Sequence, residues 1–148
     1  MKIKIVNAKR EHKEYLLRAN AEINEVNEVN HESSFSKNLD KDYFVSNPKF
    51  KCLVALADEK PVGMILYSKM YWADDGVVIW VSQTHVDKEY RKYGVFLKLV
   101  QALKNRNKDV KLISCATGRP NKKMQKIFEF AGGKQIDLLF YYIPINRE

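Results

Sequence analysis

Residues 80–97, Trp-Val-Ser-Gln-Thr-His-Val-Asp-Lys-Glu-Tyr-Arg-Lys-Tyr-Gly-Val-Phe-Leu, carry the pattern that decides the fold. A β-branched run indicates a strand, and a basic turn, Gly94 and an apolar helix follow it. The first turn of a helix offers backbone N–H groups without partners and the positive end of the helix dipole. A glycine there lets an anion approach the backbone, and Arg91 and Lys92 add positive charge. The stretch therefore predicts an anion site where a strand turns into a helix.

Outward from this stretch, hydrophobic periodicity assigns strands and helices to most of the chain. Strands are expected at Lys2–Asn7, Lys51–Ala57, Val62–Trp72, Val77–Val86, Val110–Ala116 and, as one strand or two, Ile136–Ile143. Helices are expected at Lys9–Asn27, at Leu39–Phe44, from Val95 onward, and at Asn121–Ala131. An antiparallel meander precedes a strand–helix–strand unit in the C-terminal half, so the fold class is mixed α/β (α+β).

The composition is that of one soluble globular domain over residues 1–148, with 45% hydrophobic and 30% charged residues. No apolar run approaches the roughly 18 to 20 residues that span a bilayer, and the N-terminus lacks the apolar stretch of a signal peptide. We therefore expect a cytoplasmic protein without a membrane partner. Cys52 and Cys115 lie in apolar runs and are expected to be buried, reduced thiols. The cysteines and three scattered histidines show no metal-ligand spacing, so no metal is expected.

The charge of +8 is distributed unevenly along the chain. Residues 1–75 contain 12 Lys and Arg against 12 Asp and Glu, whereas residues 76–148 contain 14 against 6. A basic half indicates an anionic partner, which can be nucleic acid, an acidic protein or a phosphorylated cofactor. The charge alone does not choose among these three.

Two motifs at a fixed spacing narrow the choice. Val86-x-x-x-Tyr90-Arg91-x-x-Gly94 follows a strand and opens a helix, and Asn121 opens a second helix that ends in an aromatic residue, Glu and Gly. Together with the preceding hairpin, this order resembles the GNAT superfamily of N-acetyltransferases, over roughly residues 2–142. The resemblance implies a central, mostly antiparallel sheet of six to seven strands with about four helices, and acetyl-CoA as the cosubstrate.

The resemblance also implies particular binding roles. The pyrophosphate of CoA is expected to bind the backbone amides of the turn, at Arg91, Lys92, Tyr93, Gly94, Val95 and Phe96. His85 and Val86 would pair through their backbone with the pantetheine arm, where two neighbouring strands splay apart. Asn121 would contact the arm near the thioester, and Phe128 is also expected beside the cofactor.

Four positions depart from the family pattern. Phe96 stands where the family often has Gly or Ala, and we expect its ring to turn into the core. Phe128 stands where many members have a Tyr that protonates the departing thiolate, and a phenyl ring has no proton to give. Ser82 and Gln83 stand where polyamine-acetylating relatives have an acidic pair, which disfavours a polyamine acceptor.

Proton transfer must then use other groups. An attacking primary amine has to be neutral, although its pKa is near 10, so it needs a base or a desolvating site. Strand alternation places Val81, Gln83 and His85 on one face and Trp80, Ser82 and Thr84 on the other. His85 has a suitable pKa, although a lone strand histidine is commonly structural. Ser82 or Thr84 could order a relay water, and Tyr141 or Tyr142 could replace the missing acid, so the catalytic candidates are Ser82, His85 and Tyr142.

Three functions remain in competition at this point. The first is an acetyltransferase acting on a primary amine of a small molecule or a protein. The second is a degenerate GNAT domain that binds CoA or a partner without turnover. The third is a nucleic-acid-binding module, which is disfavoured because its basic residues are mostly surface lysines without stacking aromatic residues between them. A homodimer is a further partner that the sequence leaves open.

Overall fold

The computed structural model describes residues 1–28, 33–139, 141 and 143–145. Its strands are β1 (Ile3–Asn7), β2 (Lys51–Ala57), β3 (Lys60–Trp72), β4 (Gly76–Val86) and β5 (Ile113–Cys115). Its helices are α1 (Lys13–Val26), α2 (Phe35–Asn38), α3 (Val95–Arg106) and α4 (Lys122–Phe130). Short 3-10 or π-helical turns lie at Arg10–His12, Leu39–Tyr43 and Lys88–Tyr93. The order of strands and helices predicted from the sequence is therefore confirmed as far as Phe130.

The five strands form one sheet in the order β1-β2-β3-β4-β5. Strands β1 to β4 are antiparallel neighbours, while β5 lies parallel to β4. Short turns join β2 to β3 and β3 to β4, whereas α1 and α2 lie between β1 and β2. A parallel neighbour requires a crossover, and α3 provides it on its way from the end of β4 to the start of β5. The N-terminus of α3 consequently lies beside the C-terminal end of β4.

The last strand expected from the sequence, at Ile136–Ile143, is absent from the described residues of that segment. Residues 136–139, 141 and 143 have no strand pairing, and the side chains of Ile136 and Tyr141 are 63% and 83% exposed. The expectation of six to seven strands is thus wrong for the described part of the chain, which has five. An apolar segment can favour the extended conformation, but a strand also needs a partner edge, which propensity does not supply.

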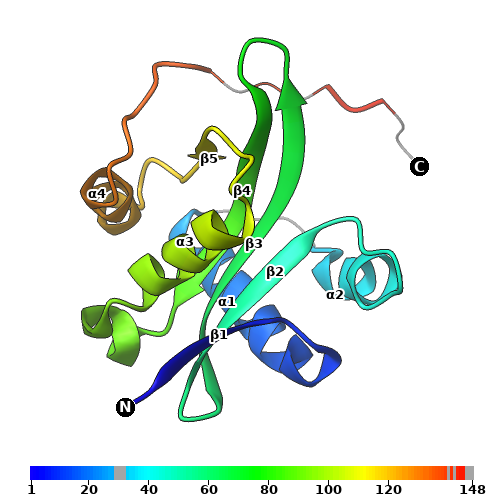
Figure 1. The fold of residues 1–148 in the computed structure, drawn as a ribbon, viewed down its shortest axis with the longest axis vertical. Helices are drawn as coiled ribbons and strands as arrows, with labels where there is room; N and C mark the ends of the chain where they lie inside the picture. Colours follow the sequence, from blue (N-terminus) through cyan, green and yellow to red (C-terminus); the bar gives the residue numbers. More distant parts are fainter. Residues whose placement is uncertain (29–32, 140, 142, 146–148) are drawn as a thin grey trace.

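Helices cover both faces of the sheet (Figure 1). Helix α3 packs on one face, where its Val95, Leu99 and Leu103 are fully buried. Helix α1 packs on the other face, where its Leu16 and Ala19 are fully buried. Burying one leucine side chain stabilises a fold by about 2 kcal/mol, so these contacts fix both helices against the central strands.

Helix α4 forms the outer part of the molecule beyond β5 (Figure 1), and none of its residues is buried. Its ring contact to α3 joins Phe128 and Phe96, whose centroids are 6.1 Å apart. The carboxamide oxygen of Asn121 accepts a hydrogen bond from the N–H of Met124 at 3.2 Å and caps the first turn. This cap fixes where α4 begins relative to the loop that leaves β5.

Candidate active site

Strands β4 and β5 separate after a short paired region. They pair from Ile79 to Val81 on β4, but β4 continues to Val86. Beyond Val81, the edge of β4 that faces β5 therefore has no strand partner among the described residues. A cavity of about 790 Å³ occupies the space, and α1, β4, the turn before α3, the end of β5 and α4 line it. We call this space the gap.

A bulge in β4 lies at the start of the gap. Leu66 of β3 pairs with Gln83 and Tyr67 pairs with Val81, so Ser82 has no counterpart. An inserted residue bends a strand and increases its twist, which carries β4 away from β5. The Ser82 hydroxyl donates a hydrogen bond to the Leu66 carbonyl at 3.3 Å, and this contact ties the bulge to β3.

The bulge also overturns one prediction from strand alternation. Val81 belongs to the core cluster under α3, together with its partner Tyr67. His85 pairs with Met64, which belongs to the cluster under α1, and its ring contacts α1. The expectation that Val81 and His85 share a face is therefore wrong, because one extra residue between them reverses the alternation.

Gly94 forms the turn between β4 and α3. It adopts the left-handed conformation, with φ of 69° and ψ of 20°, as the N-cap residue of α3. A Cβ atom added to Gly94 would meet nothing within 4 Å, so the space in front of the turn is open. The first amides of α3 face this space without a capping side chain, which is the arrangement that binds anions at helix N-termini.

The other residues of the turn take different positions. Arg91, Lys92 and Phe96 line the gap, as Gly94 does. Arg91 donates from Nε to the Val86 carbonyl at 2.9 Å, which holds its guanidinium over the end of β4.

The side chains of two turn residues point elsewhere. Val95 is fully buried in the core, and Tyr93 is about half exposed, with its ring centroid 6.4 Å from that of Tyr90. The contribution expected of Val95 and Tyr93 is therefore confined to their backbone amides. Phe96 is partly buried against the core cluster, in line with the expectation that its ring turns inward.

Asn27, which follows α1, bridges the gap to the loop between β5 and α4. Its carboxamide oxygen accepts hydrogen bonds from the N–H of Gly118 at 3.0 Å and from Nδ2 of Asn121 at 3.4 Å, and Thr117 Oγ1 lies 3.5 Å away. A side chain at Gly118 would collide with Asn27, because an added Cβ would lie 2.8 Å from that oxygen. Asn27 thus sets the position of Asn121, which sequence reasoning expected beside the thioester.

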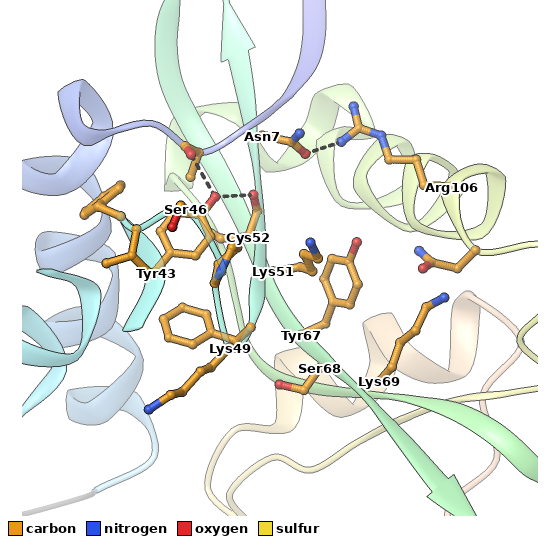
Figure 2. A pocket seen from close by; sticks show the side chains of 16 residues that line it. Asn7, Tyr43, Ser46, Lys49, Lys51, Cys52, Tyr67, Ser68, Lys69 and Arg106 are labelled. Carbon is orange, nitrogen blue, oxygen red and sulfur yellow. Dashed lines mark hydrogen bonds between the residues drawn. The ribbon is translucent and has the colours of Figure 1, made fainter. Parts of the chain in front are cut away.

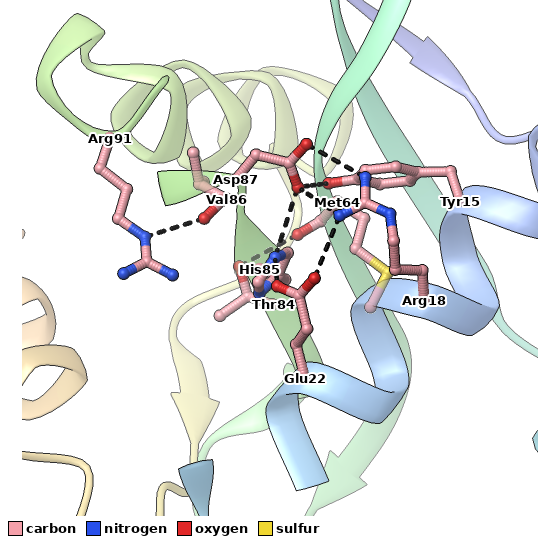
Figure 3. A network of polar contacts seen from close by, with 9 residues as sticks. All are labelled: Tyr15, Arg18, Glu22, Met64, Thr84, His85, Val86, Asp87 and Arg91. Carbon is pink, nitrogen blue, oxygen red and sulfur yellow. Dashed lines mark hydrogen bonds and ion pairs between the residues drawn. The ribbon is translucent and has the colours of Figure 1, made fainter. Parts of the chain in front are cut away.

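His85 lies in a charged network between β4 and α1 (Figure 3). Its Nε2 is 2.9 Å from Glu22 Oε2 and 3.4 Å from Asp87 Oδ1. Neither contact has hydrogen-bond geometry, so this buried nitrogen has charged neighbours but no hydrogen-bond partner among the described residues. Burial lowers the pKa of His85, although both carboxylates act in the opposite direction. The imidazole is therefore neutral near pH 7 and able to accept a proton.

Arg18 and Tyr15 of α1 complete the network. Arg18 donates from Nη1 and Nη2 to the buried carboxylate of Asp87, at 3.3 and 3.1 Å, and pairs with Glu22 at 3.1 Å. The Tyr15 hydroxyl donates to Asp87 at 3.4 Å, and burial together with Asp87 raises the pKa of Tyr15 above its usual value. Sequence reasoning missed Arg18, Glu22 and Asp87, and the available signal was an acidic residue two positions after His85 at the end of a strand.

The remaining predicted residues are placed as follows. Cys115 lines the gap, and both cysteines are free thiols. Burial raises the pKa of the Cys115 thiol and raises that of Cys52 to about 12. Thr84 donates its hydroxyl to the Met64 carbonyl at 3.1 Å. Tyr142 lies outside the described residues, and Tyr141 does not line the gap.

No group of three or more His, Cys, Asp or Glu side chains in the described ranges could hold a metal ion. Within the same ranges, every helix is too short or too polar to cross a membrane.

The separated strands, the glycine turn at a helix N-terminus and the cap on the second helix define the acetyltransferase fold class to which the motifs pointed. The family model for the acetyltransferase (GNAT) family matches residues 15–132, and the chain belongs to this family. No curated protein sequence matches the chain.

Solved structures share the fold over nearly the whole chain. A protein described as a possible acetyltransferase from Clostridium difficile 630 has a TM-score of 0.80 at 20% identity, over 99% of this chain and 100% of its own. AAC(6')-Iy in complex with the bisubstrate analog CoA-S-monomethyl-acetylneamine has a TM-score of 0.77 at 16% identity, over 97% of this chain and 99% of its own. Ribosomal-protein-alanine N-acetyltransferase from Brucella melitensis biovar Abortus 2308 has a TM-score of 0.77 at 15% identity, over 98% of this chain and 100% of its own.

Proposed function

We propose that this protein is an acetyl-CoA-dependent N-acetyltransferase that acts on a primary amine of a small molecule or a protein. The observation that carries the proposal is the gap, because an unpaired edge of β4 leads directly to the open glycine turn. A pantetheine arm carries amide groups that can pair with such an edge, and a pyrophosphate matches the free amides of a helix N-terminus. The family match and CoA-bound structures of similar fold, such as AAC(6')-Iy, support the same assignment.

The turn supplies the charge that a polyanionic substrate requires. Arg91 and Lys92 line the gap beside Gly94, and the carboxylate among the described lining residues, that of Glu22, belongs to α1. Arg91 is held by the Val86 carbonyl, so its guanidinium loses little freedom when an anion binds. In this arrangement the pyrophosphate binds at the N-terminus of α3 and the thioester lies further along β4.

The acceptor amine enters from the side of α1. Glu22 and His85 both line the gap there, so they face the region in which an amine meets the thioester. The neutral imidazole of His85 carries its hydrogen on Nε2, which faces the two carboxylates, so Nδ1 accepts the amine proton as the N–C bond forms and the C–S bond breaks. The carboxylates of Glu22 and Asp87 stabilise the resulting imidazolium. Arg18 acts as a positioning residue, because its two hydrogen bonds hold Asp87 beside the ring.

The leaving group needs no strong acid in this scheme. A thiol with a pKa near 8.5 departs as a thiolate at neutral pH, so a protein acid accelerates the step without being indispensable. Phe128 lines the gap where many family members have a tyrosine, and it contributes an apolar wall instead. Placing the amine beside the thioester supplies much of the acceleration through proximity.

A second candidate function is favoured by the same residue. A domain with Phe128 in place of the acid could bind CoA or a partner without transferring the acetyl group. The two functions differ in one measurable quantity, which is the release of free CoA in the presence of an amine.

The test is a thiol-release assay with acetyl-CoA and a panel of primary amines. The panel includes an aminoglycoside, a peptide with an N-terminal alanine, a lysine peptide and spermidine. We expect release with at least one of the first three, and spermidine to be a poor acceptor because Ser82 and Gln83 offer no carboxylate. His85→Gln should lower kcat by about 100-fold, within the range of general-base catalysis. Binding of acetyl-CoA without release across the panel would support the non-catalytic function.

A further inference from the structure

A second hollow lies beside β3, away from the gap (Figure 2). It forms because β2 begins at Lys51, opposite Tyr67, while β3 runs on to Trp72 without a β2 partner. The segment before β2 and the C-terminal end of α3 enclose a space of about 900 Å³. This hollow shares no lining residue with the gap, so no step of the proposed acetyl transfer uses it.

The wall of the hollow is strongly cationic. It includes no carboxylate, and its four cationic residues are Lys49, Lys51, Lys69 and Arg106. Two of the lysines have carboxylate partners outside the wall, Asp42 at 2.7 Å from Lys49 and Asp109 at 3.4 Å from Lys69. The other two cations have no such partner among the described residues.

Arg106 is positioned by neutral groups. Its Nη1 donates to Asn7 Oδ1 at 2.7 Å and its Nη2 donates to the Ile5 carbonyl at 3.3 Å. These contacts fix the guanidinium but leave its charge uncompensated. Lys51 makes no ion pair or side-chain hydrogen bond with a described residue, so the hollow carries two positive charges that an anion would neutralise.

Neutral donors and aromatic rings complete the wall. Tyr67 is 5% exposed, yet its hydroxyl has no hydrogen-bond partner among the described residues, and the same holds for the hydroxyl of Ser68. Figure 2 shows Lys51, Tyr67 and Lys69 around the same hollow. The rings of Tyr43 and Phe50 stack at 5.2 Å and give the hollow an apolar side.

We propose that this hollow binds a small organic anion through a phosphate or carboxylate group. Ammonium and guanidinium groups bind both oxyanions through charge-assisted hydrogen bonds, and the hydroxyl of Tyr67, the strand partner of Lys51, supplies a further donor. The apolar side formed by Tyr43 and Phe50 accommodates the carbon skeleton of the ligand. The volume matches that of small-molecule pockets, which are about 300–1,000 Å³. The proposal is independent of the acetyl-transfer function.

The test is a calorimetric titration with two probes, inorganic pyrophosphate and citrate, in the absence and presence of saturating CoA. CoA is held at the lowest concentration that saturates the turn at Gly94, so a probe that still binds occupies another site. We expect saturable binding of at least one probe that persists with CoA and weakens as the salt concentration rises. Tighter pyrophosphate binding would identify a phosphate ligand, and tighter citrate binding would identify a carboxylate ligand.

Three variants locate the binding. Lys51→Gln and Arg106→Gln should each weaken it about tenfold, the effect of losing one charge-assisted hydrogen bond. Lys60→Gln, an exposed lysine outside the hollow, is the matched control and should bind like the parent protein. If Arg106→Gln lowers the melting temperature through its lost contacts to β1, Lys51→Gln decides the test alone. Absence of saturable binding with CoA present, or equal affinity in Lys51→Gln and Lys60→Gln, would overturn the proposal.

Discussion

Replacing Gly94 with alanine separates the stability of the turn from its role in binding. At φ of 69° a residue with a Cβ atom is strained, at a cost of about 1 kcal/mol in the free energy of unfolding. For a chain of this length, such a loss lowers the melting temperature by about 2–4 °C. The added Cβ meets no protein atom within 4 Å, so it projects into the space that the pyrophosphate would occupy.

The loss of CoA affinity should be larger than the loss of stability. Displacing the pyrophosphate from one or two helix amides removes charge-assisted hydrogen bonds of about 1.5–3 kcal/mol each, or roughly a 10- to 100-fold weaker Kd. The matched control is Gly76→Ala, because Gly76 has a φ of 78°, has equally open space around it, and lies at the other end of β4, where that strand begins.

Two measurements on each variant decide the outcome. Thermal unfolding should show similar destabilisation of Gly94→Ala and Gly76→Ala. Calorimetry with acetyl-CoA should show weaker binding in Gly94→Ala alone. Equal acetyl-CoA affinity in the two variants would refute the assignment of the turn as the pyrophosphate site.

Three further predictions concern the network, the gap wall and the core. Because burial lowers the pKa of His85, kcat/KM should fall as the pH drops below 6.5, and His85→Gln should remove this fall. An unchanged pH dependence of kcat/KM in His85→Gln would exclude His85 as the base. The unfolded chain binds this proton at higher pH than the folded chain, so the free energy of unfolding should fall as pH drops through 6.5 and below, and less so in His85→Gln. Phe128→Tyr should change acetyl-CoA affinity less than about twofold and raise kcat by supplying an acid, so a lower kcat in steady-state assays would count against the leaving-group scheme. Gly63→Ala should lower the free energy of unfolding, measured in urea, by about 1–3 kcal/mol, because the added Cβ would lie 3.0 Å from Val95 Cγ1 and 3.4 Å from Ala55 Cβ. An unchanged urea midpoint would show that the core adjusts freely.

The glycine turn at Gly94 was predictable because its signal is local. Gly94, the basic residues before it and the apolar helix after it occupy one short stretch, and the structure arranges them as strand, turn and helix. The two amphipathic helices followed from periodicity for the same reason, since the buried positions of α1 and α3 repeat along each helix.

The network around His85 was only partly predictable because it depends on long-range geometry. Glu22 reaches His85 across 63 positions of sequence, and nothing near either residue indicates the contact. No glycine or proline near Ser82 indicates the bulge in the sequence, yet the bulge decides which face His85 occupies. A pattern of strict alternation therefore placed His85 wrongly on the same face as Val81.

The C-terminal segment shows a different limit. Ile136 and Leu138 have the character of strand residues, but their side chains are more than half exposed and unpaired in the described structure. Propensity describes what a segment favours, whereas pairing depends on which edge is within reach.

The most direct test of the central claim is calorimetric titration of the purified protein with acetyl-CoA. The separated strands and the open turn predict one site per chain, with a Kd between about 1 µM and 1 mM, the usual range for enzyme substrates. Binding should also be competed by free CoA, which carries the same pyrophosphate and arm. Absence of saturable binding at millimolar acetyl-CoA would contradict the assignment of the gap as a cofactor site, and with it the proposed acetyl transfer.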